Sequence, residues 1–149
     1  MKKYEFSLKR VKEFKETILN REKSVLLSLS SELRLQEEKR DQLKAELIEI
    51  GEVISQSTQS GISASMLSLY DGRRKGIRQE LETLDTKISL LVASIERQKK
   101  RVAQAKQDVS GMEKLEEKQL EEYRELEKKE NDLIIEEFIS SKMAREEAE

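Results

Sequence analysis

The chain has 149 residues, of which 40% are charged and only 4% aromatic, and its net charge is −2. It contains no proline or tryptophan, and this composition predicts long helices in place of a globular core. The absence of cysteine and histidine excludes disulfides, the usual zinc sites and histidine-based triads. No apolar run approaches the roughly 18 residues of a membrane span, and the first residues lack a signal peptide's apolar centre. We therefore expect a cytosolic protein without cofactor or metal.

A first helix is expected over about residues 6–54. Ser7 is a candidate N-cap, and Leu8, Val11, Phe14 and Ile18 follow at helical spacing. From Leu26 onward the apolar residues alternate four and three positions apart. This seam reads Leu26, Leu29, Leu33, Gln36, Arg40, Leu43, Leu47, Ile50 and Ile54. Polar residues at seam positions usually fix the register of two helices, so we assign that role to Gln36 and Arg40, with ligand binding as the alternative.

The stretch from about 55 to 63 is small and polar and contains Gly61, which is typical of a loop. Ser63 can cap a second helix, expected over about residues 64–140. Asp71-Gly72 offers a second turn signal, and a short helix ending there is the alternative. We favour one continuous helix, because apolar residues already recur at helical spacing before Asp71.

The second helix carries the longest seam of the chain, between Ile77 and Met112. It consists of Ile77, Leu81, Leu84, Ile88, Leu91, Ile95, Gln98, Val102, Ala105, Val109 and Met112. A four–three alternation over about five heptads predicts a coiled coil. The period of 3.5 residues indicates a left-handed supercoil. A seam this narrow needs a second helix to bury it, and the first helix can supply one.

A single short loop requires the two helices to run antiparallel. The sequence therefore predicts an all-α fold, a long two-helix antiparallel coiled-coil hairpin that forms one domain over residues 1–149. Because the rise per residue is the same in both helices, the N-terminal end of the first helix lies opposite about Met112. Residues 113–149 are then a C-terminal helical overhang without an intramolecular partner helix.

The overhang also differs in charge, with 14 acidic and 7 basic residues against 4 and 8 in the first 23 residues. Its sparse apolar residues include Leu115, Leu120, Tyr123, Leu126 and the run from Leu133 to Ile139. One interpretation is a solvated helix that frays at its end. The other is a docking surface whose apolar stripe is buried only by a partner.

Catalysis is not expected, because carboxylates on a two-helix hairpin stay exposed and keep ordinary pKa values. No phosphate-binding glycine loop or metal cluster is present. Arg97–Lys106 and Arg73–Arg78 are basic and raise a nucleic-acid-binding alternative. These runs lack interleaved aromatic residues for stacking on bases, and the net charge does not favour a nucleic-acid partner.

Several short motifs resemble those of the flagellar export protein FliJ family. The C-terminal ones are Glu113-Lys114-Leu115-Glu116-Glu117-Lys118, Tyr123, Lys129-Glu130 and Glu136-Glu137. The opening Tyr4-Glu5-Phe6-Ser7-Leu8-Lys9-Arg10-Val11, the glycine-containing loop and Tyr70 are also similar to that family. The chain departs from the family's pattern at Ser110-Gly111-Met112 and at Ile135-Glu136-Glu137. The resemblance covers nearly the whole chain.

The resemblance implies a central-stalk-like component of the flagellar type III export apparatus, serving bacterial flagellum biogenesis, motility and chemotaxis. Its implied partners are the ring of the export ATPase FliI, the export gate protein FlhA and export chaperones, at the cytoplasmic face of the cell membrane without membrane insertion. Ring binding is expected at Leu8, Val11, Leu115, Lys118, Tyr123, Leu126, Glu130, Leu133, Glu136 and Glu137. Gate binding is expected at Leu43, Leu47, Ile50, Tyr70, Ile77 and Leu81. The alternative from another class is a generic cytoplasmic coiled-coil scaffold or chaperone that self-associates.

Overall fold

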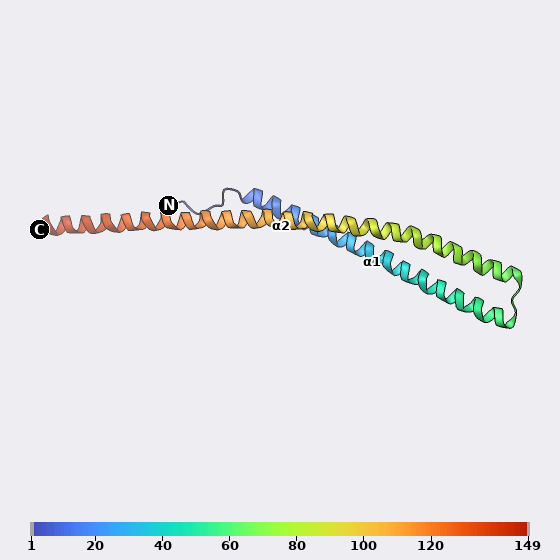
Figure 1. Ribbon diagram of the computed structural model, residues 1–149. Helices are drawn as coiled ribbons and strands as arrows, with labels where there is room; N and C mark the ends of the chain where they lie inside the picture. Colours follow the sequence, from blue (N-terminus) through green and yellow to red (C-terminus); the bar gives the residue numbers. More distant parts are fainter. Residues whose placement is uncertain (1, 149) are drawn as a thin grey trace. The chain divides into compact units, whose positions relative to one another are not determined.

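A computed structural model describes residues 2–148 and contains two helices, α1 (Lys9–Ser60) and α2 (Ala64–Ala148). Figure 1 shows both helices and the short loop that joins them. No strand occurs in residues 2–148. The two helices pack against each other as an all-α helical hairpin, which confirms the predicted fold class.

The loop is much shorter than predicted, because α1 continues to Ser60 and only residues 61–63 lie outside the helices. The polar residues at the end of α1 stay helical by bonding back to the preceding turn. The hydroxyl of Thr58 donates to the carbonyl of Ile54 at 2.7 Å, and that of Ser60 donates to the carbonyl of Gln56 at 3.1 Å. Such local bonds satisfy serine and threonine side chains within a helix, so a polar composition did not mark the helix end.

The turn is built by two residues. Gly61 has a φ of 89°, in the left-handed region that glycine enters without steric cost. The Ser63 hydroxyl then accepts the N–H of Met66 at 3.2 Å, which confirms the predicted cap of the second helix.

The predicted start of α1 and the predicted end of α2 also need correction. Ser7 does not cap α1: the helix begins at Lys9, and the Ser7 hydroxyl donates to Oε1 of Gln119 at 3.2 Å. The alternative turn at Asp71-Gly72 is wrong, because α2 runs through it and on to Ala148, beyond the expected end near residue 140. Asp71 favours the helix there by pairing with Arg74 and Lys75 one turn later.

The chain divides into two compact units, which we describe separately. The loop unit is Arg21–Val102, which holds the turn, most of α1 and the first part of α2. The terminal unit comprises residues 2–20 and 103–148 of the described chain.

The predicted seam of α2 is the buried face of that helix in both units. Its buried members in the loop unit are Ile77, Ile88, Ile95, Gln98 and Val102, and in the terminal unit they are Ala105 and Val109. The remaining predicted seam positions are half-buried. The four–three spacing therefore identified the packing face of α2 correctly.

The α1 seam of the loop unit also lies where the pattern placed it. Its leucines and isoleucines from Leu26 to Ile54 are half-buried, and Gln36 is only 2% exposed. The Gln36 amide donates to the carboxylate of Glu32 at 2.8 Å, and Arg40 lies 3.9 Å from the carboxylate of Asp85 on α2. The Arg40 ion pair joins the two helices, whereas the Gln36 hydrogen bond lies within α1, so the register-fixing role of these residues stays a prediction.

Candidate partner-binding surfaces

The terminal unit uses lysines at the positions of α1 that face α2. The predicted face of Leu8, Val11, Phe14 and Ile18 is wrong at two positions: Val11 is 39% and Phe14 63% exposed, whereas Leu8 and Ile18 are half-buried. Lys12, Lys15 and Leu19 are also half-buried, and together with Leu8 they follow the same four–three alternation as the seam of α1. A lysine fits such a position because its aliphatic stem packs on apolar surface while the ammonium group reaches a charged partner.

Both lysines meet acids of α2. Nζ of Lys12 lies 2.6 Å from Oε2 of Glu116, and Nζ of Lys15 lies 3.8 Å from Oδ2 of Asp108. The hydrogen bond with Glu116 holds the pKa of Lys12 above its ordinary value. This part of the interface is therefore ionic, in contrast to the isoleucine-rich seam of the loop unit.

Residues 2–8, which we call the N-terminal strap, precede α1 and lie on α2. Phe6 is buried, with 7% of its surface exposed. The hydroxyl of Tyr4 donates to the carbonyl of Glu116 at 3.2 Å, and that of Tyr123 donates to the carbonyl of Lys2 at 2.6 Å. The rings of Tyr4 and Tyr123 are 5.4 Å apart at 56°, a tilted arrangement that aromatic pairs favour.

Contacts from α1 and the strap correct the expectation that residues after 112 have no intramolecular partner helix, because Lys12 of α1 pairs with Glu116. The strap is not helical, and its hydrogen bonds reach along α2 as far as Tyr123. We call residues 124–148 of α2 the bare segment. All of it is exposed except Glu130, which is half-buried.

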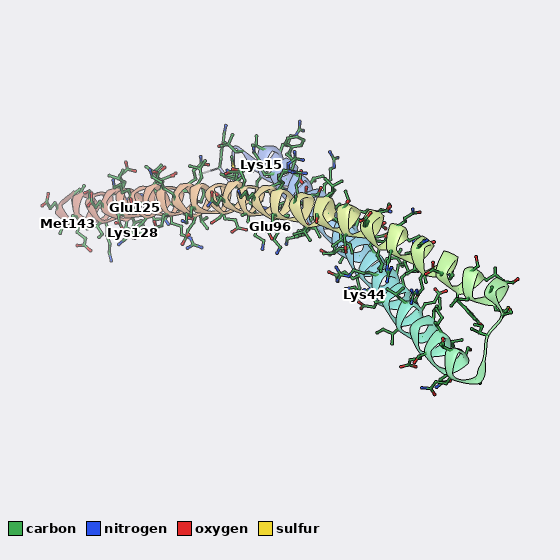
Figure 2. The ribbon with its side chains drawn as sticks, turned by 45° about the vertical axis from the view of Figure 1, so that its right-hand side comes forward. Lys15, Lys44, Glu96, Glu125, Lys128 and Met143 are labelled. Carbon is green, nitrogen blue, oxygen red and sulfur yellow. The ribbon has the colours of Figure 1, made fainter. Side chains whose placement is uncertain are left out.

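The bare segment presents large apolar side chains to solvent. Leu126 is 56% exposed, Leu133 59% and Phe138 69%. Further exposed apolar residues there are Ile134, Ile135, Ile139 and Met143. Figure 2 shows Glu125, Lys128 and Met143 projecting away from the helix. An apolar stripe of this kind indicates a surface for a partner.

The residues expected to bind the ATPase ring fall into two groups in the terminal unit. Leu8, Leu115, Tyr123 and Glu130 are half-buried, whereas the exposed ones are Val11, Lys118, Leu126, Leu133, Glu136 and Glu137. Only the exposed group is open to a partner without displacement of the strap or of α1. Their role in ring binding stays a prediction.

The residues expected to bind the gate lie mainly in the seam of the loop unit. Ile77 is fully buried, and Leu43, Leu47, Ile50, Tyr70 and Leu81 are half-buried. They hold the two helices together, and a partner could reach most of them only at their edges. Gate binding by these residues stays a prediction.

Other apolar residues near the turn are more exposed than any of these. Leu69 is 68% exposed and Ile48 65%, and Met66 and Leu67 are also exposed. Sequence reasoning missed them because it followed the seam. The signal that could have found them is a large apolar residue at an off-seam position next to the turn.

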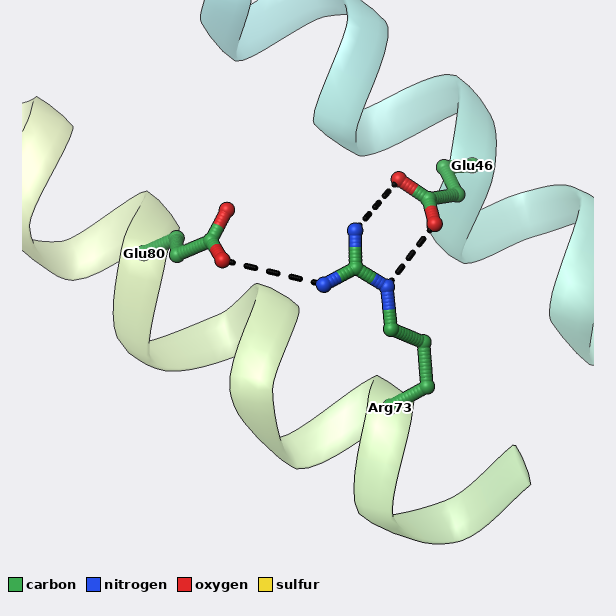
Figure 3. Close-up of polar contacts among 3 residues, drawn as sticks. All are labelled: Glu46, Arg73 and Glu80. Atoms are coloured by element: carbon green, nitrogen blue, oxygen red, sulfur yellow. Dashed lines mark hydrogen bonds and ion pairs between the residues drawn. The ribbon is translucent and has the colours of Figure 1, made fainter. Parts of the chain in front are cut away.

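A groove with a volume of 640 Å³ also lies between α1 and α2 in the loop unit. Its lining includes Leu43, Glu46, Gly76, Glu80 and Leu84. Arg73 forms a bidentate pair with Glu46 through two hydrogen bonds of 2.9 Å and lies 3.7 Å from Glu80 (Figure 3). The Arg73 guanidinium beside Glu46 holds the pKa of that carboxyl below its ordinary value. Two carboxylates at the groove are thus balanced by one arginine.

No group of acidic residues in the described chain is arranged to hold a metal ion. Neither described helix has a stretch of the length and apolar character that crossing a membrane requires. The chain is therefore an α-helical hairpin protein with apolar residues exposed on its helix surfaces.

Comparison with known proteins gives the family. Residues 4–148 match the family model described as "Flagellar FliJ protein", and the chain belongs to this family. Its members are non-catalytic components of flagellar protein export. No curated protein and no solved structure matches the chain.

Proposed function

We propose that this protein is the central-stalk-like component of the flagellar type III export apparatus. It couples the ring of the export ATPase FliI to the membrane export gate protein FlhA and assists the delivery of substrates and export chaperones. It works at the cytoplasmic face of the membrane and is held there by its partners.

The observation that carries the proposal is the bare segment of α2. A helix that is free in water normally keeps large apolar side chains off its surface, whereas this one exposes them over several turns. Burying Leu126, Leu133 and Phe138 in a ring would contribute about 1.5–3 kcal/mol each before ordering costs are subtracted. A ring of several subunits can supply that burial on more than one side of the helix.

The loop unit supports the gate-binding half of the proposal. Its exposed apolar residues lie on both sides of the turn, with Ile48 on α1 and Met66, Leu67 and Leu69 on α2. The terminal and loop units thus each have an apolar surface available to a partner, and a component that couples two machines needs two such surfaces.

The same exposed stripe also fits the second candidate, a scaffold that self-associates. Sedimentation velocity of the purified chain separates the two. The stalk proposal predicts one species whose mass does not rise with concentration, whereas self-association predicts a concentration-dependent dimer or larger assembly.

Truncation after Arg124 tests the proposal. This position removes the bare segment but keeps Glu116, Gln119 and Tyr123, which hold the strap. We expect the truncated chain to keep its helicity by circular dichroism and to lose both binding to purified FliI and stimulation of ATP hydrolysis. If it stimulates as well as the full chain, the bare segment has no role in the ring.

A further inference from the structure

The seam of α2 continues past the point where α1 and the strap stop covering it. In heptad spacing from Val109, one row of seam positions is Val109, Glu116, Tyr123, Glu130 and Glu137, and the other is Met112, Gln119, Leu126 and Leu133. Beyond Tyr123 the seam therefore alternates leucine and glutamate. The exposed residues Ile134 and Phe138 flank it and widen its apolar part.

The covered part of the same seam shows what kind of residue packs on it. Opposite Glu116, α1 presents Lys12, whose ammonium group lies 2.6 Å from the carboxylate. Lys15 lies 3.8 Å from Asp108, which is next to the seam residue Val109, and Leu8 and Leu19 flank the two lysines at seam positions. An acidic and apolar helix face is thus matched by a helix with lysine and leucine at four–three spacing.

We infer that the bare segment binds a helical segment of a partner protein that carries lysine or arginine at heptad positions between leucine-like residues. Leu126, Leu133 and Phe138 bury the apolar side chains of that helix, and Glu137 pairs with one of its cations. The inference rests on the proposed function, because it specifies the chemistry of the partner at the same surface.

Charge favours such a partner over a second copy of this surface. Residues 124–148 contain eight acidic and five basic residues, so their net charge is −3 and two bare segments side by side would repel each other. The first 23 residues, which include the lysines that cover the acidic seam, have a net charge of +4. A cationic helix from the partner continues this complementarity along α2.

A pair of designed helical peptides tests the inference with the full chain. One peptide has leucine and lysine at alternating seam positions, and the other has glutamate in place of each lysine. In fluorescence anisotropy we expect the lysine peptide to bind the full chain at least about tenfold more tightly than the glutamate peptide. We expect truncation after Arg124 to remove this preference.

Charge reversal on the chain supplies the matched control. Glu137 lies on the seam, whereas Glu125→Lys makes the same charge change at an exposed position that belongs to neither row of the seam. We expect Glu137→Lys to weaken binding of the lysine peptide and to strengthen binding of the glutamate peptide. Glu125→Lys should change neither affinity by more than about twofold. Equal effects of the two variants, equal binding of the two peptides, or binding through association of two chains would each overturn the inference.

These outcomes are separate from the test of function. If truncation abolishes ATPase stimulation while the two peptides bind equally, the proposed function stands and the cationic-helix inference fails. If the peptides behave as expected while the truncated chain still stimulates FliI, the surface has the inferred chemistry but does not act in the ring.

Discussion

Phe6 and Phe14 carry the same side chain in opposite environments within the terminal unit. Phe6 in the strap is 7% exposed, and Phe14 on α1 is 63% exposed. Replacing a buried phenylalanine by alanine usually costs about 3–5 kcal/mol, so Phe6→Ala should release residues 2–20 from α2. We expect hydrogen exchange of the amides in residues 9–20 to become much faster. Phe14→Ala is the control and should leave this exchange nearly unchanged; the same acceleration in both variants would contradict the assigned burial.

The pair formed by Arg73 and Glu46 makes a prediction about pH. The pKa of Glu46 is lowered by its hydrogen bond with Arg73, so the folded state favours the ionised carboxylate. The stabilisation is therefore present at neutral pH and is lost as the pH falls below the ordinary glutamate value of about 4.3. Glu46→Gln should lower the melting temperature at pH 7 and have a smaller effect at pH 3. An effect of equal size at both pH values would show that the pair does not contribute through charge.

Replacing glycine by alanine should have opposite effects on stability in the turn and in α2. Gly61 has a φ of 89°, whereas a Cβ added at Gly76 in α2 would meet nothing within 4 Å. Gly76→Ala should therefore stabilise the chain by up to about 1 kcal/mol through helix propensity. Gly61→Ala should destabilise it, because alanine is strained at positive φ. Urea denaturation followed by circular dichroism measures both changes, and stabilisation by Gly61→Ala would show that the turn does not need this conformation.

At the level of the helices, regular apolar spacing correctly predicted which face packs. Where that spacing was missing, the packing face could not be predicted. The seam from Ile77 to Met112 could be predicted because isoleucine, leucine and valine mark nearly every position that packs. The start of α1 could not, because lysines occupy its seam while Val11 and Phe14 form a competing pattern that faces solvent. The strap has no period at all, and its contacts depend on tertiary packing alone.

The two candidate surfaces could be predicted to different degrees, because only one of them follows from the regular pattern of the helices. The bare segment could be anticipated from the length of the two helices, although its start moved from residue 113 to 124 because the strap covers α2 up to Tyr123. Near the turn, the seam pattern drew attention to Ile77, which is fully buried. The exposed Leu69 and Ile48 lie outside the seam, so a search that followed the seam did not select them.

For the whole molecule, the central claim is that one chain binds the ATPase and the gate together. The most direct measurement is mass photometry of the full chain mixed with purified FliI and the soluble domain of FlhA. We predict a single species that contains all three proteins. Truncation after Arg124 should remove only FliI from it, and Leu69→Ala combined with Ile48→Ala should remove only FlhA. Mutually exclusive binding of FliI and FlhA, with no ternary species at any mixing ratio, would contradict the account.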